Sequence, residues 1–181
     1  MKKYLLGKYL LGIAIIMAVI FVSGCVSNSE NIDDPQTLAQ NGVLIKYPGN
    51  WVVANSLSND SIISVADPNS TVPGSDFAQI NVNIEKRQLS SSLNTMYNKT
   101  YTQLFSNSDY TLLAEGNTSK GDMNALECMY SVNENGTIKQ HKAIWIEKGN
   151  YVYVLLFTAP QSEFESQNKN FEFILNSFKI T

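Results

Sequence analysis

Apolar and polar residues alternate with a period of two in several segments after residue 42. In the clearest of them, residues 78–86, Ile80, Val82 and Ile84 alternate with polar residues, a pattern typical of a strand with one solvated face. Patterns of this kind predict strands over residues 43–46, 61–66, 78–86, 111–118, 124–133, 137–147 and 151–158. The pair Asn135-Gly136 between two of them predicts a tight antiparallel hairpin.

Two other segments have a helical period. Apolar residues of 93–105 recur on one helical face, and Ser90–Ser92 offer the N-cap. Ser162 and Glu165 match a capping box, which predicts the start of a second helix with an apolar stripe that ends at Phe178. Hairpin-linked strands with helices in two separate places indicate an antiparallel α+β sandwich.

The N-terminal pattern is typical of an export signal. Three lysines within the first eight residues precede an apolar run over 9–22, and Val22-Ser23-Gly24-Cys25 follows. This order of charged, apolar and small residues predicts a secretory signal peptide over residues 1–24. The cysteine at the cleavage site resembles a prokaryotic lipobox, which predicts a lipid on Cys25 and a mature protein held at the outer face of the cytoplasmic membrane.

An uncleaved N-terminal anchor is the alternative. The apolar run of about 14 residues is shorter than the roughly 20 that a membrane-spanning helix needs. Either arrangement places the rest of the chain outside the cytoplasm. Residues 25–41 are polar and lack aromatics, so we expect a flexible tether there, before a folded domain over 42–181.

Charge and cysteine content narrow the classes of partner. The part after residue 24 carries 10 basic and 16 acidic residues, a net charge of −6. A modestly acidic domain without a basic patch is not expected to bind nucleic acid or anionic headgroups directly. With Cys25 lipidated, Cys128 has no cysteine to pair with, and we expect it to be a small buried hydrophobe.

Both ends of the expected domain resemble those of PsbP-like domains. The first end is Gly-Val-Leu-Ile-Lys-Tyr-Pro at 42–48 followed by Trp51, and the last is Tyr-Val-Tyr-Val-Leu-Leu-Phe-Thr-Ala-Pro at 151–160 followed by a helix with Asn-Ser-Phe at 176–178. The resemblance covers about residues 42–180 and implies a prokaryotic lipoprotein, with archaea as the expected source. It also implies an antiparallel sheet of about six or seven strands with helices packed on both faces, and a role in binding or assembly rather than catalysis.

Candidate catalytic and metal-binding groups are sparse. Cys128 and His141 lie on neighbouring predicted strands and could form a nucleophile and a base, but no oxyanion-hole motif accompanies them. His141 is the only histidine, whereas a metal site wants several converging ligands. The loop 67–76 is rich in oxygen ligands for calcium, yet it lacks the EF-hand glycine and glutamate. We therefore expect no catalytic residues, no metal and no cofactor.

Two further sets of residues are candidate sites. Asn-x-Ser/Thr sequons, which are possible N-glycosylation sites, occur at Asn59, Asn69, Asn98, Asn117 and Asn135. Aromatic residues could line a ligand pocket, with Trp51, Trp145 and Tyr151 as candidates, although aromatics at such positions more often fill the core.

These observations favour a non-catalytic lipoprotein that binds or assembles a protein partner in the membrane or envelope. The first alternative is a solute-binding module with an aromatic-lined pocket. The second is a hydrolase with an unrecognised set of catalytic groups.

Overall fold

The structure, a computed structural model, describes residues 32, 34–72, 74, 77–134 and 136–181, which belong to one compact unit. The predicted signal peptide, Cys25 and the first part of the predicted tether lie outside the described residues. Among the helices that the structure describes, none is long and apolar enough to cross a membrane.

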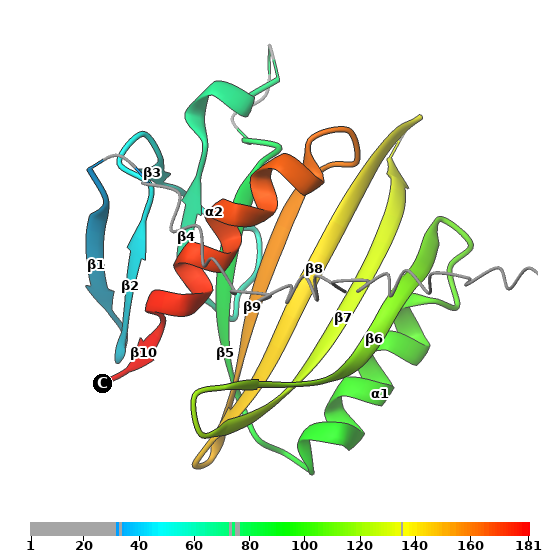
Figure 1. The fold of residues 1–181 in the computed structure, drawn as a ribbon. Helices are drawn as coiled ribbons and strands as arrows, with labels where there is room; N and C mark the ends of the chain where they lie inside the picture. Colours follow the sequence, from blue (N-terminus) through cyan, green and yellow to red (C-terminus); the bar gives the residue numbers. More distant parts are fainter. Residues whose placement is uncertain (1–31, 33, 73, 75–76, 135) are drawn as a thin grey trace, which may run out of the picture. The chain divides into compact units, whose positions relative to one another are not determined.

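A seven-stranded, fully antiparallel sheet forms the centre of the domain (Figure 1). Its strands, in spatial order, are β3 (Val52–Val53), β4 (Ser61–Ala66), β5 (Asn81–Gln88), β9 (Tyr151–Pro160), β8 (Thr137–Lys148), β7 (Met123–Glu134) and β6 (Tyr110–Lys120). The predicted antiparallel hairpin of β7 and β8 is confirmed, because Glu134 pairs with Thr137. The antiparallel α+β class is therefore as the sequence predicts.

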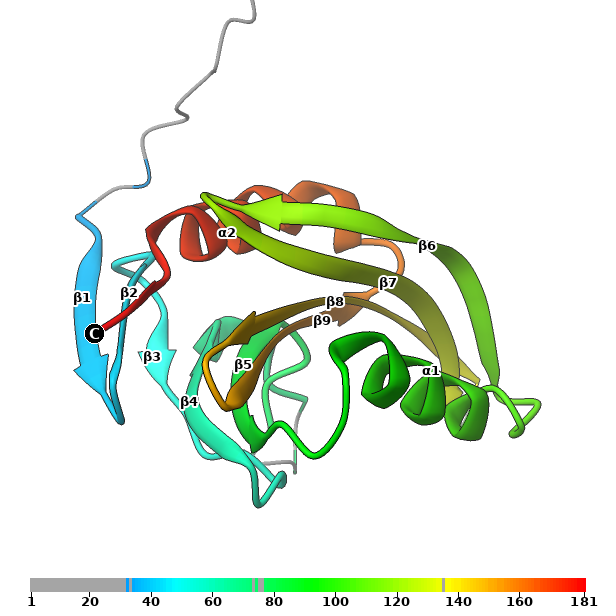
Figure 2. The same ribbon diagram turned by 90° about the horizontal axis from the view of Figure 1, so that it is seen from below.

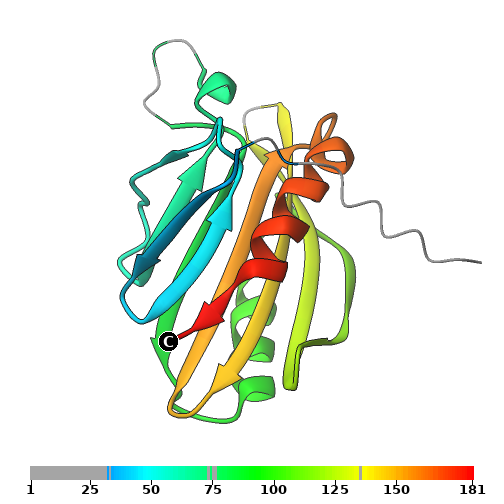
Figure 3. The same ribbon diagram turned by 60° about the vertical axis from the view of Figure 1, so that its left-hand side comes forward.

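A second, three-stranded sheet was not expected. It consists of β1 (Gln36–Gln40), β2 (Val43–Tyr47) and β10 (Lys179–Ile180), in the order β1-β2-β10. Figure 3 shows β10 at the C-terminal end of the chain, beside β2. The strand predicted at 43–46 thus belongs to this small sheet rather than to the large one.

β1 corrects the predicted tether, which was expected to extend to residue 41. All five β1 residues pair with β2, and a two-residue turn of Asn41 and Gly42, both at positive φ, joins the strands. Asn-Gly is the preferred sequence of such a turn. The polar composition of β1 concealed it, because backbone pairing with β2 forms this strand although most of its side chains are exposed.

The helices are α1 (Leu93–Leu104) and α2 (Phe164–Ser177), with a short 3-10 helix, η1, at Pro68–Ser70. Ser92 is the N-cap of α1, as predicted, and its hydroxyl accepts a 3.2 Å hydrogen bond from the Thr95 amide. The capping box predicted for α2 is wrong. The Glu163 amide donates to the Pro160 carbonyl in a turn that follows β9, so the N-cap falls on Glu163 instead of Ser162.

Buried apolar residues form two clusters, which we name after their tryptophans. The Trp51 core includes Phe171 and Ile174 of α2, and the Trp145 core includes Tyr97 and Tyr101 of α1. Consecutive residues of β8 alternate between the clusters, with Ala143 and Trp145 in one and Ile144 and Ile146 in the other. This is the alternation that strand geometry gives to successive side chains. In Figure 2, β6 and β7 curve over α1, which lies on the concave side of this part of the sheet.

Candidate functional site

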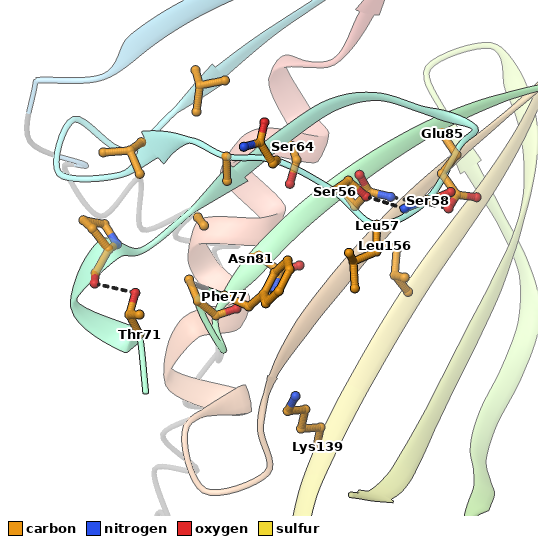
Figure 4. Close-up of a pocket in the computed structure, with 18 of the residues that line it drawn as sticks. Ser56, Leu57, Ser58, Ser64, Thr71, Phe77, Asn81, Glu85, Lys139 and Leu156 are labelled. Carbon is orange, nitrogen blue, oxygen red and sulfur yellow. Dashed lines mark hydrogen bonds between the residues drawn. The ribbon is translucent and has the colours of Figure 1, made fainter. Parts of the chain in front are cut away.

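A groove of about 1000 Å³ opens beside β3, β4 and β5 (Figure 4). Part of its wall is the loop 54–58, and Leu156 of β9 contributes to it from the neighbouring strand. Leu156 also packs against the Trp145 core. The groove therefore borders the part of the sheet that α1 covers.

Polar side chains from adjacent strands form the floor of the groove. Ser64, Asn83 and Glu85 line it and are each only 7 % exposed. Ser64 and Asn83 are direct partners across β4 and β5, and Asn81 lies one step along the same face of β5. A polar floor of this kind is costly to bury unless its groups are hydrogen-bonded.

A chain of polar contacts connects this floor to the loop above it. The Ser61 hydroxyl donates to Asn83 Oδ1 at 2.6 Å, and Asn83 Nδ2 donates to Glu85 Oε1 at 3.4 Å. Arg87 pairs with Glu85 at 2.5 Å and with Asp60 at 3.3 Å. The network holds the Asp60 end of the loop against β5.

Exposed apolar side chains surround the polar floor. Of the nine large apolar side chains that are markedly exposed in the described part of the chain, four line the groove, namely Val52, Val53, Leu57 and Phe77. Leu57 is the most exposed of all, at 83 %. A cluster of exposed apolar groups on a folded domain is a common feature of interaction sites.

The ionisable groups of the groove are engaged in ion pairs. Besides the Glu85–Arg87 pair, Lys139 Nζ lies 2.6 Å from Glu134 Oε2 where β7 and β8 border the groove. Asn81 Nδ2 donates to the Ala78 carbonyl at 3.0 Å. Within the described residues, the Asn81 side-chain oxygen and the Ser64 hydroxyl have no hydrogen-bond partner. These two uncharged polar groups remain available to a ligand.

The three aromatic residues predicted for a pocket are not brought together. Trp51 and Trp145 are buried in different cores. Tyr151 is partly exposed, and the Lys86 ammonium lies 4.2 Å from its ring centroid. None of the three lines the groove. The two tryptophans are in the cores because their large apolar area stabilises the fold most when it is fully buried.

Cys128 and His141 lie on adjacent strands, and no hydrogen bond joins them in the part of the chain that the structure describes. Cys128 lies opposite Ala143 and is fully buried, while His141 stacks on Tyr130 and its Nδ1 shares a 2.9 Å hydrogen bond with the Thr158 hydroxyl. Burial raises the pKa of the Cys128 thiol to about 11 and lowers the pKa of His141 to about 4. At neutral pH the thiol is protonated, which removes the nucleophile that such a pair requires.

The remaining sequence candidates lie at the surface. Of the sequons, Asn59, Asn69, Asn98 and Asn117 are exposed, whereas Asn135 lies outside the described residues. Asp67 accepts a 2.9 Å hydrogen bond from the Asn69 amide and so caps η1. No cluster of three or more potential metal-ligating side chains occurs among the residues that the structure describes.

Sequence reasoning did not find the groove. Asn81, Asn83 and Glu85 occupy the polar positions of the alternating segment 78–86, and this pattern is normally that of a solvated strand face. The available signal was the run of exposed-looking apolar residues in and after β3, which includes Leu57. No local pattern links that run to β5, because the loop 54–60 meets β5 only in the folded domain.

Comparison with known proteins supports the fold. No curated protein matches this chain. The solution structure of cyanobacterial PsbP (CyanoP) from Synechocystis sp. PCC 6803 is similar, with a TM-score of 0.60, 12% identity, and coverage of 84% of this chain and 96% of CyanoP. LpqN of Mycobacterium tuberculosis, described as involved in cell envelope biogenesis, is similar with a TM-score of 0.54, 14% identity, and coverage of 81% and 90%. A family model described as PsbP-like protein matches residues 13–180, and the chain therefore belongs to the PsbP-like family.

Proposed function

We propose that this protein is a lipid-anchored, non-catalytic binding protein at the outer face of the cytoplasmic membrane, and that it binds or helps to assemble a protein complex of the membrane or envelope. The observation that carries the proposal is the groove, with a polar floor and an apolar rim, on a PsbP-like domain. Its occupant would be a segment of the partner protein.

The anchor follows from Cys25 and the segment before it. A cysteine with two acyl chains gives stable attachment, because each buried CH₂ contributes about 0.8 kcal/mol. The acidic mature part of the chain offers no electrostatic attraction to anionic lipids. Attachment would therefore depend on the lipid, and the folded domain would remain free to face a partner.

The arrangement of the two cores supports an α/β/α sandwich in which α1 and α2 cover opposite faces of the large sheet. In this arrangement the helices protect most of both faces, and the groove is where a partner reaches the sheet. The likeness to LpqN, whose description associates that protein with envelope biogenesis, is compatible with an envelope role. The absence of a nucleophile at Cys128 at neutral pH supports a binding role over the hydrolase alternative.

Two variants test the proposal in native membranes. Cys25→Ala should lose the lipid, detected by mass spectrometry, and should release the domain from the membrane if the signal is cleaved elsewhere. Chemical crosslinking of the wild-type chain should trap a partner, and Leu57→Asp should reduce that yield strongly. Leu113→Asp, at an exposed leucine of β6 outside the groove, is the matched control and should crosslink like the wild type. Equal yields from both leucine variants would contradict the proposed site.

A further inference from the structure

The chemistry of the groove selects among partners. Both acidic side chains that line it and its lysine are paired with opposite charges inside the domain, Glu85 with Arg87 and Glu134 with Lys139. Glu85 is nearly buried, so a charged group that drew Arg87 away from it would leave a carboxylate without its partner, which is costly. The Glu134–Lys139 pair is more exposed and contributes less. The groove is therefore matched to a ligand without charge.

The available hydrogen-bonding groups suit a peptide backbone. The Asn81 side-chain oxygen can accept from an amide N–H, and the Ser64 hydroxyl can donate to a carbonyl. Positions on one face of β5 repeat at about 7 Å, which is also the repeat of same-side groups along any extended chain. From Asn81 to Glu85 the floor spans about 13 Å, enough for roughly five extended residues.

The rim sets the side chains that such a segment would carry. Val52, Leu57 and Phe77 are exposed apolar groups that line the groove with the polar floor. Val52 shares the face of Ser64 because it pairs with Ala66. An extended segment with apolar residues at alternate positions would cover these groups, while its backbone reaches the floor. A sugar would satisfy the floor equally well but would leave the aliphatic rim in water, since the groove offers Phe77 as its only aromatic platform among the described lining residues.

We infer that the groove binds an extended, uncharged polypeptide segment of about five residues with alternating apolar side chains. This inference rests on the proposed function and specifies the part of the partner that is recognised. The hydrogen-bonding floor fixes the backbone, and the apolar rim selects the side chains.

Direct binding to the full-length chain in detergent micelles tests the inference. The probes are three pools of fluorescent hexapeptides in which Val, Leu or Ile occupies every second position. The other positions hold Ser, Thr or Asn in the uncharged pool, Asp in the acidic pool and Lys in the basic pool. Maltohexaose serves as a neutral sugar competitor. The uncharged pool should bind the wild type. Leu57→Ser should weaken binding about 5-fold or more, by loss of apolar contact. Ser64→Ala should weaken it about 3- to 10-fold, by loss of one hydrogen bond.

Leu113→Ser is the matched control, because it removes a partly exposed leucine outside the groove, and it should bind like the wild type. Thermal unfolding of each variant verifies that the fold is retained; since Leu57 is 83 % exposed, Leu57→Ser should unfold at the wild-type temperature. The inference is overturned if no pool binds, if a charged pool binds as tightly as the uncharged one, if maltohexaose displaces the peptides, or if Leu57→Ser and Ser64→Ala leave binding unchanged. Failure here with groove-dependent crosslinking intact would refute the ligand class and leave the proposed function standing. Absence of any crosslinked partner with the wild-type chain, or equal yields from Leu57→Asp and Leu113→Asp, would refute the proposed function itself.

Discussion

The indole N–H of Trp145 donates a 3.0 Å hydrogen bond to the hydroxyl of Tyr101, and both groups are buried where α1 meets β8. This bond satisfies the only polar atom of the tryptophan side chain. Because a buried donor without a partner costs roughly 1–3 kcal/mol, the pair fixes how α1 packs on the sheet.

Tyr101→Phe should therefore destabilise the domain by about 1–3 kcal/mol, because it removes the acceptor and leaves the indole N–H unsatisfied. Urea unfolding followed by tryptophan fluorescence measures the change. Tyr151→Phe, at a partly exposed tyrosine, is the control and should change stability by less than about 0.5 kcal/mol. If both substitutions lowered the free energy of unfolding equally, the hydrogen bond between Trp145 and Tyr101 would not contribute to stability as proposed.

His141 should make stability depend on acid. Burial lowers its pKa in the folded domain to about 4, from 6.5; nearby Lys139 lowers it further, and Glu134 opposes the shift. Between these values the unfolded chain binds more protons, so the stabilisation is complete above pH 6.5 and is lost as the pH falls toward 4. The wild type should lose roughly 2–3 kcal/mol more than His141→Gln between pH 7.5 and pH 4.5. Parallel pH profiles of the two proteins would refute this account.

Cys128 should be unreactive in the folded protein, because its pKa is raised to about 11 by burial and it has no exposed surface. In a Cys25→Ser chain, where it is the sole thiol, an aromatic disulfide reagent at pH 8 should react only as fast as the domain unfolds. Adding urea should bring the reaction to completion within seconds. Rapid stoichiometric labelling of the native chain would restore the thiol as a candidate reactive group.

β1 should contribute to stability although its composition is that of a linker. Leu38 is its one residue that packs against the Trp51 core. Leu38→Asn should destabilise the full-length chain by about 1 kcal/mol, since the leucine is only partly buried. Ala39→Asn, at the neighbouring exposed position, should be close to neutral. If neither substitution changed the free energy of unfolding, residues 36–40 would be part of the tether rather than of the folded domain.

Sequence patterns that involve only adjacent residues predicted the corresponding helix starts, turns and strands well. The Ser92 cap and the hairpin at 135–136 each depend on a few adjacent residues, and period two gave most strands of the large sheet. β1 was missed because its side chains are mostly polar and exposed, like those of a linker, although the adjacent Asn41-Gly42 pair is the same turn signal as Asn135-Gly136. The α2 cap shifted because the turn after Pro160 sets where the helix begins.

The candidate site depended on contacts between distant segments. Asn83 is polar whether it faces water or the floor of a groove, and only the folding of the loop 54–60 against β5 decides which. The same limit applies to Trp51 and Trp145, because residue type alone does not distinguish a pocket wall from a core. The family resemblance provided the fold in advance, and the groove became visible only in the structure.

Site-specific photo-crosslinking in native membranes tests the central claim, that the groove is where a partner binds. A photoreactive amino acid at position 57, on the groove rim, is compared with one at Glu165, an exposed position on α2. The account predicts a discrete crosslinked partner from position 57 and little or none from position 165. Adducts of equal yield from both positions, or from position 165 alone, would contradict it.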